Sequence, residues 1–158
     1  MRKINNKGQT LIEALVALSV STIIIAAITM AVITGMNNAT FSKNQNLATG
    51  FAQQGMDILH QQSQSDWATF DGMATNITYC LVQNETTLDS DCPDSPNINS
   101  SFVRKVKIEP PSAGCSSGKK VSVTVSWGDG KCTDAGNKYC HNVSLDSCFA
   151  QTNTSTNP

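Results

Sequence analysis

The apolar run at residues 11–33 constrains this chain more than any other feature, because it contains one charged residue, Glu13. As a helix, the run would be about 35 Å long, which is enough to cross the hydrocarbon core of a bilayer. Basic residues are concentrated in residues 1–8, and the next one is Lys43. Segments rich in Lys and Arg stay on the cytoplasmic side of a membrane, so the N-terminus is expected in the cytoplasm. The sequence therefore predicts a single-pass cytoplasmic (inner) membrane protein with an extracytoplasmic head.

Two ordinary explanations of such a segment fit less well. A secretory signal would have a shorter apolar core and a small-residue cleavage site, which residues 35–38 (GMNN) do not provide. A plain membrane anchor accounts for the length but not for Glu13, because a carboxylate at the centre of a membrane costs about 2.5–3.5 kcal/mol. We therefore expect Glu13 to have a partner.

Residues 7–18, KGQTLIEALVAL, resemble the type IV prepilin cleavage and methylation motif. The resemblance implies that prepilin peptidase cuts after Gly8 and methylates the new amino group of Gln9. It also implies that Glu13 is the assembly residue and pairs with the Gln9 amine of a neighbouring pilin subunit. The first mature residue of the family is most often apolar. A terminal Gln9 can cyclise and lose its charge, so methylation would have to come first.

The helix is expected to continue beyond the membrane as an amphipathic segment at residues 37–64. Apolar residues recur there at helical spacing in two adjoining rows. These rows are Leu47, Phe51 and Ile58, and Ala48, Ala52, Met56 and Leu59. Gly50 and Gly55 weaken the helix and allow a bend or local unwinding. Trp67 and Phe70 are expected to fill the joint between this helix and a sheet.

Strand signals follow in residues 77–83, 102–108, 121–127 and 139–145. In the third of these, valines and Trp127 alternate with polar residues, and a Gly128-Asp129-Gly130 turn leads to the returning strand. The hairpin resembles those of minor pilins of the type IV pilus modification family. We predict an α+β, pilin-like fold in which a long N-terminal helix packs on a small antiparallel β-sheet head.

The predicted organisation has five parts. They are a prepilin leader (1–8), a transmembrane or filament-core helix (9–36), an amphipathic helix (37–64), a disulfide-stapled β-rich head (65–150) and a flexible tail (151–158).

The cysteines are six in number, all lie in the predicted head and none forms a CxxC pair. An even set in a small polar domain indicates disulfides and an oxidising compartment rather than zinc. The disulfide candidates are Cys80, Cys92, Cys115, Cys132, Cys140 and Cys148. Short closures of Cys80 with Cys92 and of Cys132 with Cys140 would leave Cys115 for Cys148, but the sequence does not choose among the pairings.

No catalytic, cofactor-binding or metal site is predicted. Cys140 and His141 are adjacent, and neighbours in a strand point to opposite faces, so we expect no dyad. The acidic loop carrying Asp89, Asp91 and Asp94 is expected to be solvated rather than to bind calcium.

One local excess of positive charge occurs in the predicted head, and we expect it to lie on solvated strand edges rather than to bind DNA. Its members are Arg104, Lys105, Lys107, Lys119 and Lys120. Without residues 1–8, the net charge of the chain would change from −1 to −4, which is unlike a basic nucleic-acid-binding domain.

The sequence thus predicts a structural, non-enzymatic subunit of a type IV pilus-like filament, more typical of a minor than a major pilin. It would be stored in the inner membrane and then incorporated into a cell-surface or periplasmic filament. A type II secretion-type pseudopilin and a DNA-uptake pilin remain alternatives. A further alternative, of another class, is a non-assembling, membrane-anchored extracellular binding protein.

Overall fold

The computed structural model describes residues 7–92, 95–111, 115–116, 118–133 and 137–151. Most of the predicted leader and tail, together with Asp94, lies outside these residues. The chain separates into two compact units, residues 1–43 and residues 44–158, and each is considered by itself.

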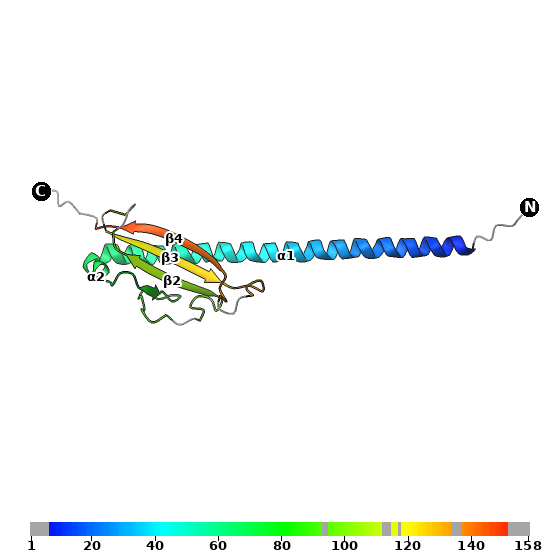
Figure 1. The fold of residues 1–158 in the computed structure, drawn as a ribbon. Coiled ribbons are helices and arrows are strands. Elements are labelled where there is room, and N and C mark those ends of the chain that lie inside the picture. The colour runs from blue at the N-terminus through cyan, green and yellow to red at the C-terminus, as the bar shows by residue number, and fades with distance from the viewer. Residues whose placement is uncertain (1–6, 93–94, 112–114, 117, 134–136, 152–158) are drawn as a thin grey trace, which may run out of the picture. The chain divides into compact units, whose positions relative to one another are not determined.

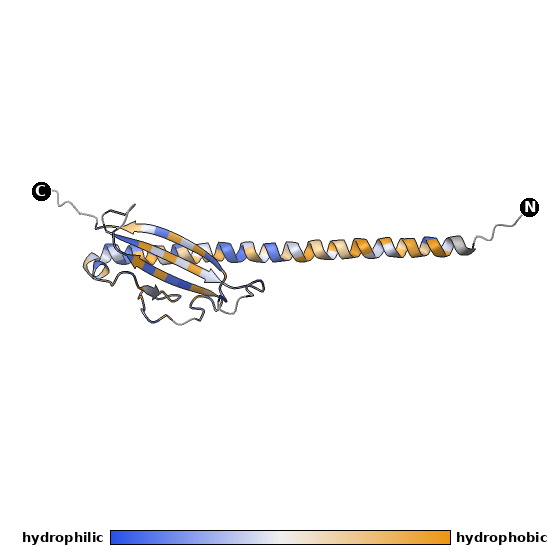
Figure 2. Cartoon of the chain, in the orientation of Figure 1, coloured by the Kyte–Doolittle hydropathy of each residue, from blue (hydrophilic) through white to orange (hydrophobic). Residues whose placement is uncertain are grey.

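The first unit consists of the N-terminal part of α1, which is a continuous α-helix over Lys7–Ser65. It is the one described helix that is long and apolar enough to cross a membrane. Figure 2 shows the concentration of hydrophobic residues along this part of α1. The large apolar side chains between Leu11 and Met36 are all at least half exposed. This surface therefore suits contact with lipid or with other helices.

Four hydroxyl groups in this apolar stretch are satisfied within the helix. Ser19, Ser21, Thr22 and Thr29 each donate a hydrogen bond of 2.8 Å to a backbone carbonyl three or four residues earlier. A hydroxyl bonded in this way needs no water. The four polar residues are therefore compatible with a bilayer.

The C-terminal part of α1 belongs to the second unit and packs on the sheet through small residues. Ala48, Ala52 and Leu59 are fully buried, whereas Leu47 is 37% exposed. The buried face therefore centres on the second of the two predicted rows. The unwinding that Gly50 and Gly55 allowed does not occur, because α1 is helical through both residues.

Four strands form one antiparallel sheet in the order β1-β2-β3-β4 (Figure 1). Their bounds are Thr78–Cys80 for β1, Phe102–Glu109 for β2, Lys119–Trp127 for β3 and His141–Phe149 for β4. The returning strand thus starts and ends later than the predicted 139–145. The predicted α+β architecture, a long helix packed on a small antiparallel sheet, is confirmed.

The inner face of the sheet follows the predicted alternation. Val121, Val123, Val125 and Trp127 of β3 are buried, while the residues between them are half exposed. Across β2 and β4, Val123 pairs with Val106 and Leu145. Burial of these apolar side chains against α1 supplies most of the driving force for forming the head.

A short helix, α2 (Trp67–Asp71), follows α1 and was missing from the sequence prediction. The carboxylate of Asp66 caps it by accepting a hydrogen bond of 3.0 Å from the backbone N–H of Thr69. The hydroxyl and N–H of Thr69 lower the pKa of Asp66. Phe70 is buried with its ring centroid 5.5 Å from that of Phe149, so the joint between helix and sheet is filled largely as predicted.

Alanine substitutions at Gly50 and Gly55 provide a matched test of the helix–sheet packing. A Cβ at Gly50 would meet nothing within 4 Å, so Gly50→Ala should raise the free energy of unfolding by about 0.8–1.0 kcal/mol. A Cβ at Gly55 would lie 3.0 Å from Arg104 Cδ and 3.1 Å from Val123 Cγ1, so Gly55→Ala should lower it. Urea unfolding of the full chain in detergent micelles, followed by tryptophan fluorescence, measures both. Equal stabilisation by the two substitutions would contradict the close approach at Gly55.

Candidate functional site

The predicted processing and assembly residues lie at the start of α1. Gly8 and Gln9 belong to its first described turn, and Glu13 follows Gln9 by four residues. The Glu13 side chain is exposed, and so are its apolar neighbours Ile12 (64%) and Leu15 (60%). The structure thus presents a carboxylate on an otherwise apolar helix surface.

The cysteines form three disulfides, which are Cys80–Cys92, Cys115–Cys148 and Cys132–Cys140, and none is free. The Cα–Cα separations are 5.4, 5.6 and 5.5 Å. These distances lie in the range that a disulfide requires. Of the pairings that the sequence left open, the structure adopts the one with the two short closures.

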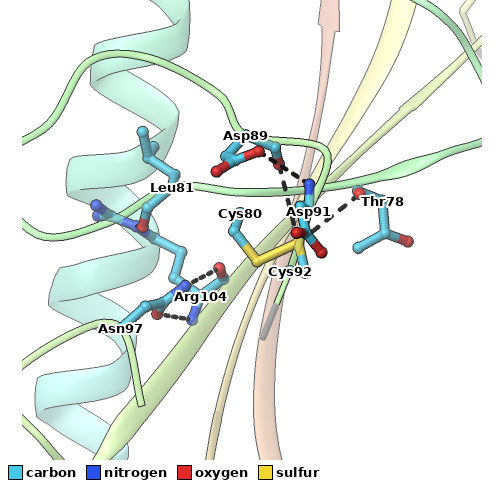
Figure 3. Close-up of a disulfide and its surroundings, with 8 residues drawn as sticks. All are labelled: Thr78, Cys80, Leu81, Asp89, Asp91, Cys92, Asn97 and Arg104. Carbon is cyan, nitrogen blue, oxygen red and sulfur yellow. Dashed lines mark hydrogen bonds between the residues drawn. A yellow bond between two sulfur atoms is a disulfide. The ribbon is translucent and has the colours of Figure 1, made fainter. Parts of the chain in front are cut away.

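The Cys80–Cys92 disulfide anchors a long loop to the outer edge of the sheet (Figure 3). Beside it, Cys80 and Asp89 exchange two backbone hydrogen bonds of 2.7 and 3.0 Å. Together, these links fix the position of Cys80 at the end of β1. The carbonyl groups of the next two residues, Leu81 and Val82, are thereby held facing Arg104.

Arg104 is the residue whose position differs most from the sequence prediction. It was expected on a solvated strand edge, but its side chain is fully buried beneath α1. The guanidinium donates from Nε to the Leu81 carbonyl at 3.0 Å and from Nη2 to the Val82 carbonyl at 3.2 Å. From Nη1 it donates to the Phe51 carbonyl of α1 at 3.0 Å and to Gln54 Oε1 at 3.4 Å. One side chain therefore joins α1, β2 and the loop after β1.

In the described part of the chain, the oxygen atoms around the Arg104 guanidinium all belong to neutral groups. Burial lowers its pKa to about 10, so the group still carries its proton at neutral pH. A buried cation is stable only when its donors are satisfied, which is what the carbonyl oxygens provide. The planar guanidinium suits this role because it directs donors to several acceptors at once.

Asn97 completes this arrangement from the loop side (Figure 3). Its amide nitrogen donates to the Arg104 carbonyl at 2.9 Å, and its amide oxygen accepts from the Arg104 backbone N–H at 2.7 Å. The side chain thus pairs with β2 as a neighbouring strand would. This pairing continues the edge of the sheet past the end of the short β1, whose partners on β2 are residues 105–107.

Lys119 is the second buried cation of the head. Its Nζ donates to the carbonyl of Met73 at 2.9 Å, to that of Phe70 at 3.5 Å and to that of Asp71, whose carboxylate lies 3.8 Å away. It thereby satisfies carbonyl groups at the C-terminal end of α2, where positive charge is favourable. This residue ties α2 to the start of β3.

The basic cluster predicted from the sequence is therefore not one surface. Arg104 and Lys119 point to the inner side of the sheet, whereas the nearby lysines belong to the outer side. There, Lys107 pairs with Glu109 at 2.7 Å and Lys120 pairs with Asp146 at 3.1 Å. The expectation of solvated edges was wrong for the two buried residues. The alternation of the strands could have shown this burial, because residues two apart in a strand point to the same face of the sheet. Arg104 is two residues from Phe102 in β2, and Lys119 is two residues from Val121 in β3.

Another expectation corrected by the structure concerns Cys140 and His141. Their donor atoms do not diverge, but lie within 4.8 Å of each other and of those of Asp129 and Cys132. Alternation does not apply to this pair because β4 begins at His141, so Cys140 precedes the strand. Since Cys140 is disulfide-bonded, it is not a nucleophile in this state. The prediction that the chain is not an enzyme stays a prediction.

A shallow hollow of about 460 Å³ lies between the C-terminal end of α1 and the end of β4. Its lining includes His60, Gln64, Trp67 and Phe149. His60 Nε2 lies 2.9 Å from Gln64 Nε2, and its ring packs edge-on to Phe149 at 5.4 Å. These contacts give His60 a packing role.

Replacing Arg104 tests its role in holding the head together. Arg104→Met should lower the free energy of unfolding by about 3 kcal/mol or more, because several buried carbonyl groups would lose their donor. Arg104→Lys should restore only part of this loss, since a single ammonium group does not reach the same acceptors. Lys107→Met is the matched control on the same strand, and it should change stability by less than about 1 kcal/mol. Urea unfolding of the full chain in micelles measures all three, and equal values for the methionine variants would refute the proposed role of Arg104.

Comparison with known protein families gives one match. Residues 3–29 match the family model of the prokaryotic N-terminal methylation motif. No curated protein and no solved structure matches the chain. The match includes Gly8, Gln9 and Glu13 and the first part of the apolar stretch of α1.

Proposed function

We propose that this chain, which carries the prepilin-type signal of type IV pilins, is a structural subunit of a type IV pilus-like filament. The observation that carries the proposal is the match at residues 3–29, which continues directly into an exposed apolar helix. If this helix belonged to the core of a soluble protein, the rest of the chain would cover these side chains. Here they are available for lipid before assembly and for neighbouring helices afterwards.

Processing would take place while α1 is anchored in the inner membrane. In this proposal, prepilin peptidase removes residues 1–8 and methylates the amino group of Gln9. Removal of the leader takes away Arg2, Lys3 and Lys7, the positive charges that hold the N-terminus on the cytoplasmic side. The remaining α1 can then move out of the bilayer with less opposition, because its apolar part keeps one charged side chain.

Glu13 would direct the insertion of each subunit. Its carboxylate is costly in an apolar medium when alone, and the same holds for the amino group of Gln9. Contact between Glu13 of one subunit and the Gln9 amine of its neighbour removes both penalties together. In this proposal the contact forms between neighbouring subunits, which would give the growing filament its register.

The head would remain outside the cytoplasm and make up the exposed part of the subunit. Its three disulfides are consistent with an oxidising compartment. We propose a minor rather than a major subunit, on the basis of the polar Gln9. The burial of Arg104 and Lys119 removes these two cations from the surface cluster considered for DNA binding, so that cluster gives no support to a DNA-uptake pilin.

Processing is tested by the intact mass and N-terminal sequence of the chain recovered from cells. The native chain should begin at N-methylated Gln9 and carry three disulfides. Gly8→Val should retain Met1, because the residue before the cleavage site would no longer be glycine. Gly35→Ala, at a helix position where a Cβ meets nothing within 4 Å, is the control that should be processed normally. A native chain that still begins at Met1 would exclude prepilin processing.

Assembly is tested by replacing Glu13. Glu13→Ala and Glu13→Gln should both be processed and reach the membrane at the native level, yet be at least about tenfold depleted from sheared filaments, because neither offers a charge to the Gln9 amine. Quantitative immunoblotting of membrane and filament fractions measures this depletion. The control Glu85→Ala changes an exposed acid in the loop after β1 and should leave incorporation unchanged.

Normal incorporation of both Glu13 variants would overturn the proposed pairing. Normal head function in the membrane, without any filament fraction, would instead favour the membrane-anchored binding protein. A filament confined to the periplasm would favour a type II secretion-type pseudopilin over a surface pilus.

A further inference from the structure

The connection between β3 and β4 gathers four potential metal ligands. Asp129 and Cys132 follow β3, while Cys140 and His141 lie at the start of β4. One ligand atom from each lies within 4.8 Å of those of the other three, and all four residues are half-buried. The connection lies at the opposite end of the sheet from α2 (Figure 1).

Backbone contacts hold two of these ligands in place. Asp129 Oδ1 accepts from the Lys131 N–H at 2.8 Å, which turns Oδ2 toward His141 Nε2 at 3.1 Å. The Asp129 N–H lies 3.4 Å from the Cys132 sulfur, and the Cys132 N–H donates to the Asp129 carbonyl at 3.1 Å. The turn therefore keeps the carboxylate and the sulfur on the same side.

The remaining ligands are positioned by the sheet. The His141 ring packs against buried Trp127, its partner across β3 and β4, with centroids 5.5 Å apart. Gly128, directly after β3, lies close to Lys138, shortly before β4. A Cβ on Gly128 would overlap the Lys138 carbonyl oxygen, so the backbones of these two segments are in close contact there. The ring contact and the pairing of Trp127 with His141 do not involve the sulfur atoms of the disulfide.

We propose that this connection binds one zinc ion when Cys132 and Cys140 are reduced. Two thiolates, an imidazole nitrogen and a carboxylate oxygen form a four-coordinate donor set that suits Zn²⁺. Calcium and magnesium prefer sets made of oxygen alone, so they would not compete effectively. In the disulfide form, the two sulfurs are bonded to each other and the set is incomplete.

The conversion requires a reductant, for which a dithiol suffices. The dithiol transfers two electrons and two protons to the Cys132–Cys140 bond and becomes a cyclic disulfide, while the two cysteines become thiols. Zinc then displaces both thiol protons into solvent as the thiolates bind. The β3–β4 connection would thus have two closed forms, one covalent and one held by metal. The metal form would keep the two cysteines together in a chain that has not yet met an oxidant.

The test uses the full chain in micelles, reduced by a dithiol and transferred to oxygen-free buffer without reductant. Co²⁺ serves as the spectroscopic probe. The reduced chain should bind one tightly held Co²⁺ with thiolate-to-cobalt charge-transfer bands and the visible spectrum of a tetrahedral site. Zn²⁺ should displace it, and the air-oxidised chain should give neither signal. Absence of binding by the reduced chain would overturn the proposal.

Substitutions then identify the ligands. Cys132→Ser with Cys140→Ser should abolish the charge-transfer bands, although four other cysteines remain. His141→Gln and Asp129→Asn should each weaken binding by at least about ten- to hundredfold, which is the loss typical of even an outer-shell residue. Their matched controls, His60→Gln in α1 and Asp146→Asn on the outer face of β4, should bind as the native chain does. An unchanged spectrum in the double cysteine variant would place the metal elsewhere and refute this site.

A second measurement uses the native sequence, so it does not depend on the folding of any variant. The reduced chain is alkylated with and without one equivalent of Zn²⁺, and the modified cysteines are mapped by mass spectrometry. Zinc should protect Cys132 and Cys140 selectively over the cysteines of the other two disulfides. Equal protection of all six cysteines, or of none, would contradict the assignment.

Discussion

The buried guanidinium of Arg104 is the interaction on which the arrangement of the head depends. The sheet and the C-terminal part of α1 form a small core, to which the loop after β1 adds the buried side chains of Leu81 and Ile98. Arg104 joins these parts through hydrogen bonds to Phe51 in α1 and to Leu81 and Val82 in the loop. Because a buried cation is strongly unfavourable without these acceptors, the three parts must occupy their native positions together. Gly55 belongs to the same arrangement, since a larger residue would meet the Arg104 side chain.

The disulfides also hold the parts of the head in their native positions, through covalent links in its loops and strand ends. Cys80–Cys92 holds the loop whose carbonyl groups receive Arg104, and Cys132–Cys140 closes the connection between β3 and β4. Cys115–Cys148 fixes the segment between β2 and β3 to the end of β4. Each bond limits the unfolded chain more than it adds contacts to the folded one. This would suit the proposed filament subunit, whose head would stay exposed to solvent while its helix takes part in assembly.

The two parts of the continuous helix α1 make different kinds of contact. The N-terminal part exposes its apolar side chains, and hydroxyl groups such as those of Ser19 and Thr29 are satisfied within the helix, so its surface suits an apolar partner. The C-terminal part covers a sheet through alanine and glycine, which allow close contact. The proposed function follows from this division, since lipid and neighbouring helices are the partners that suit the first part.

The sequence alone determined the features that depend on local pattern. The apolar run, the motif around Gly8 and Glu13, and the alternation of β3 are periodic or contiguous, so the long helix, the α+β head and the family motif could be read directly. Tertiary structure decided what depends on contacts between distant residues. Alternation in β2 places Arg104 on the inner face of the sheet, but only the carbonyl groups of α1 and the loop explain how a cation is satisfied there. The disulfide pairing and the convergence of Asp129 with His141 required the folded sheet, because pairing across strands sets which side chains meet, and spacing along the chain does not.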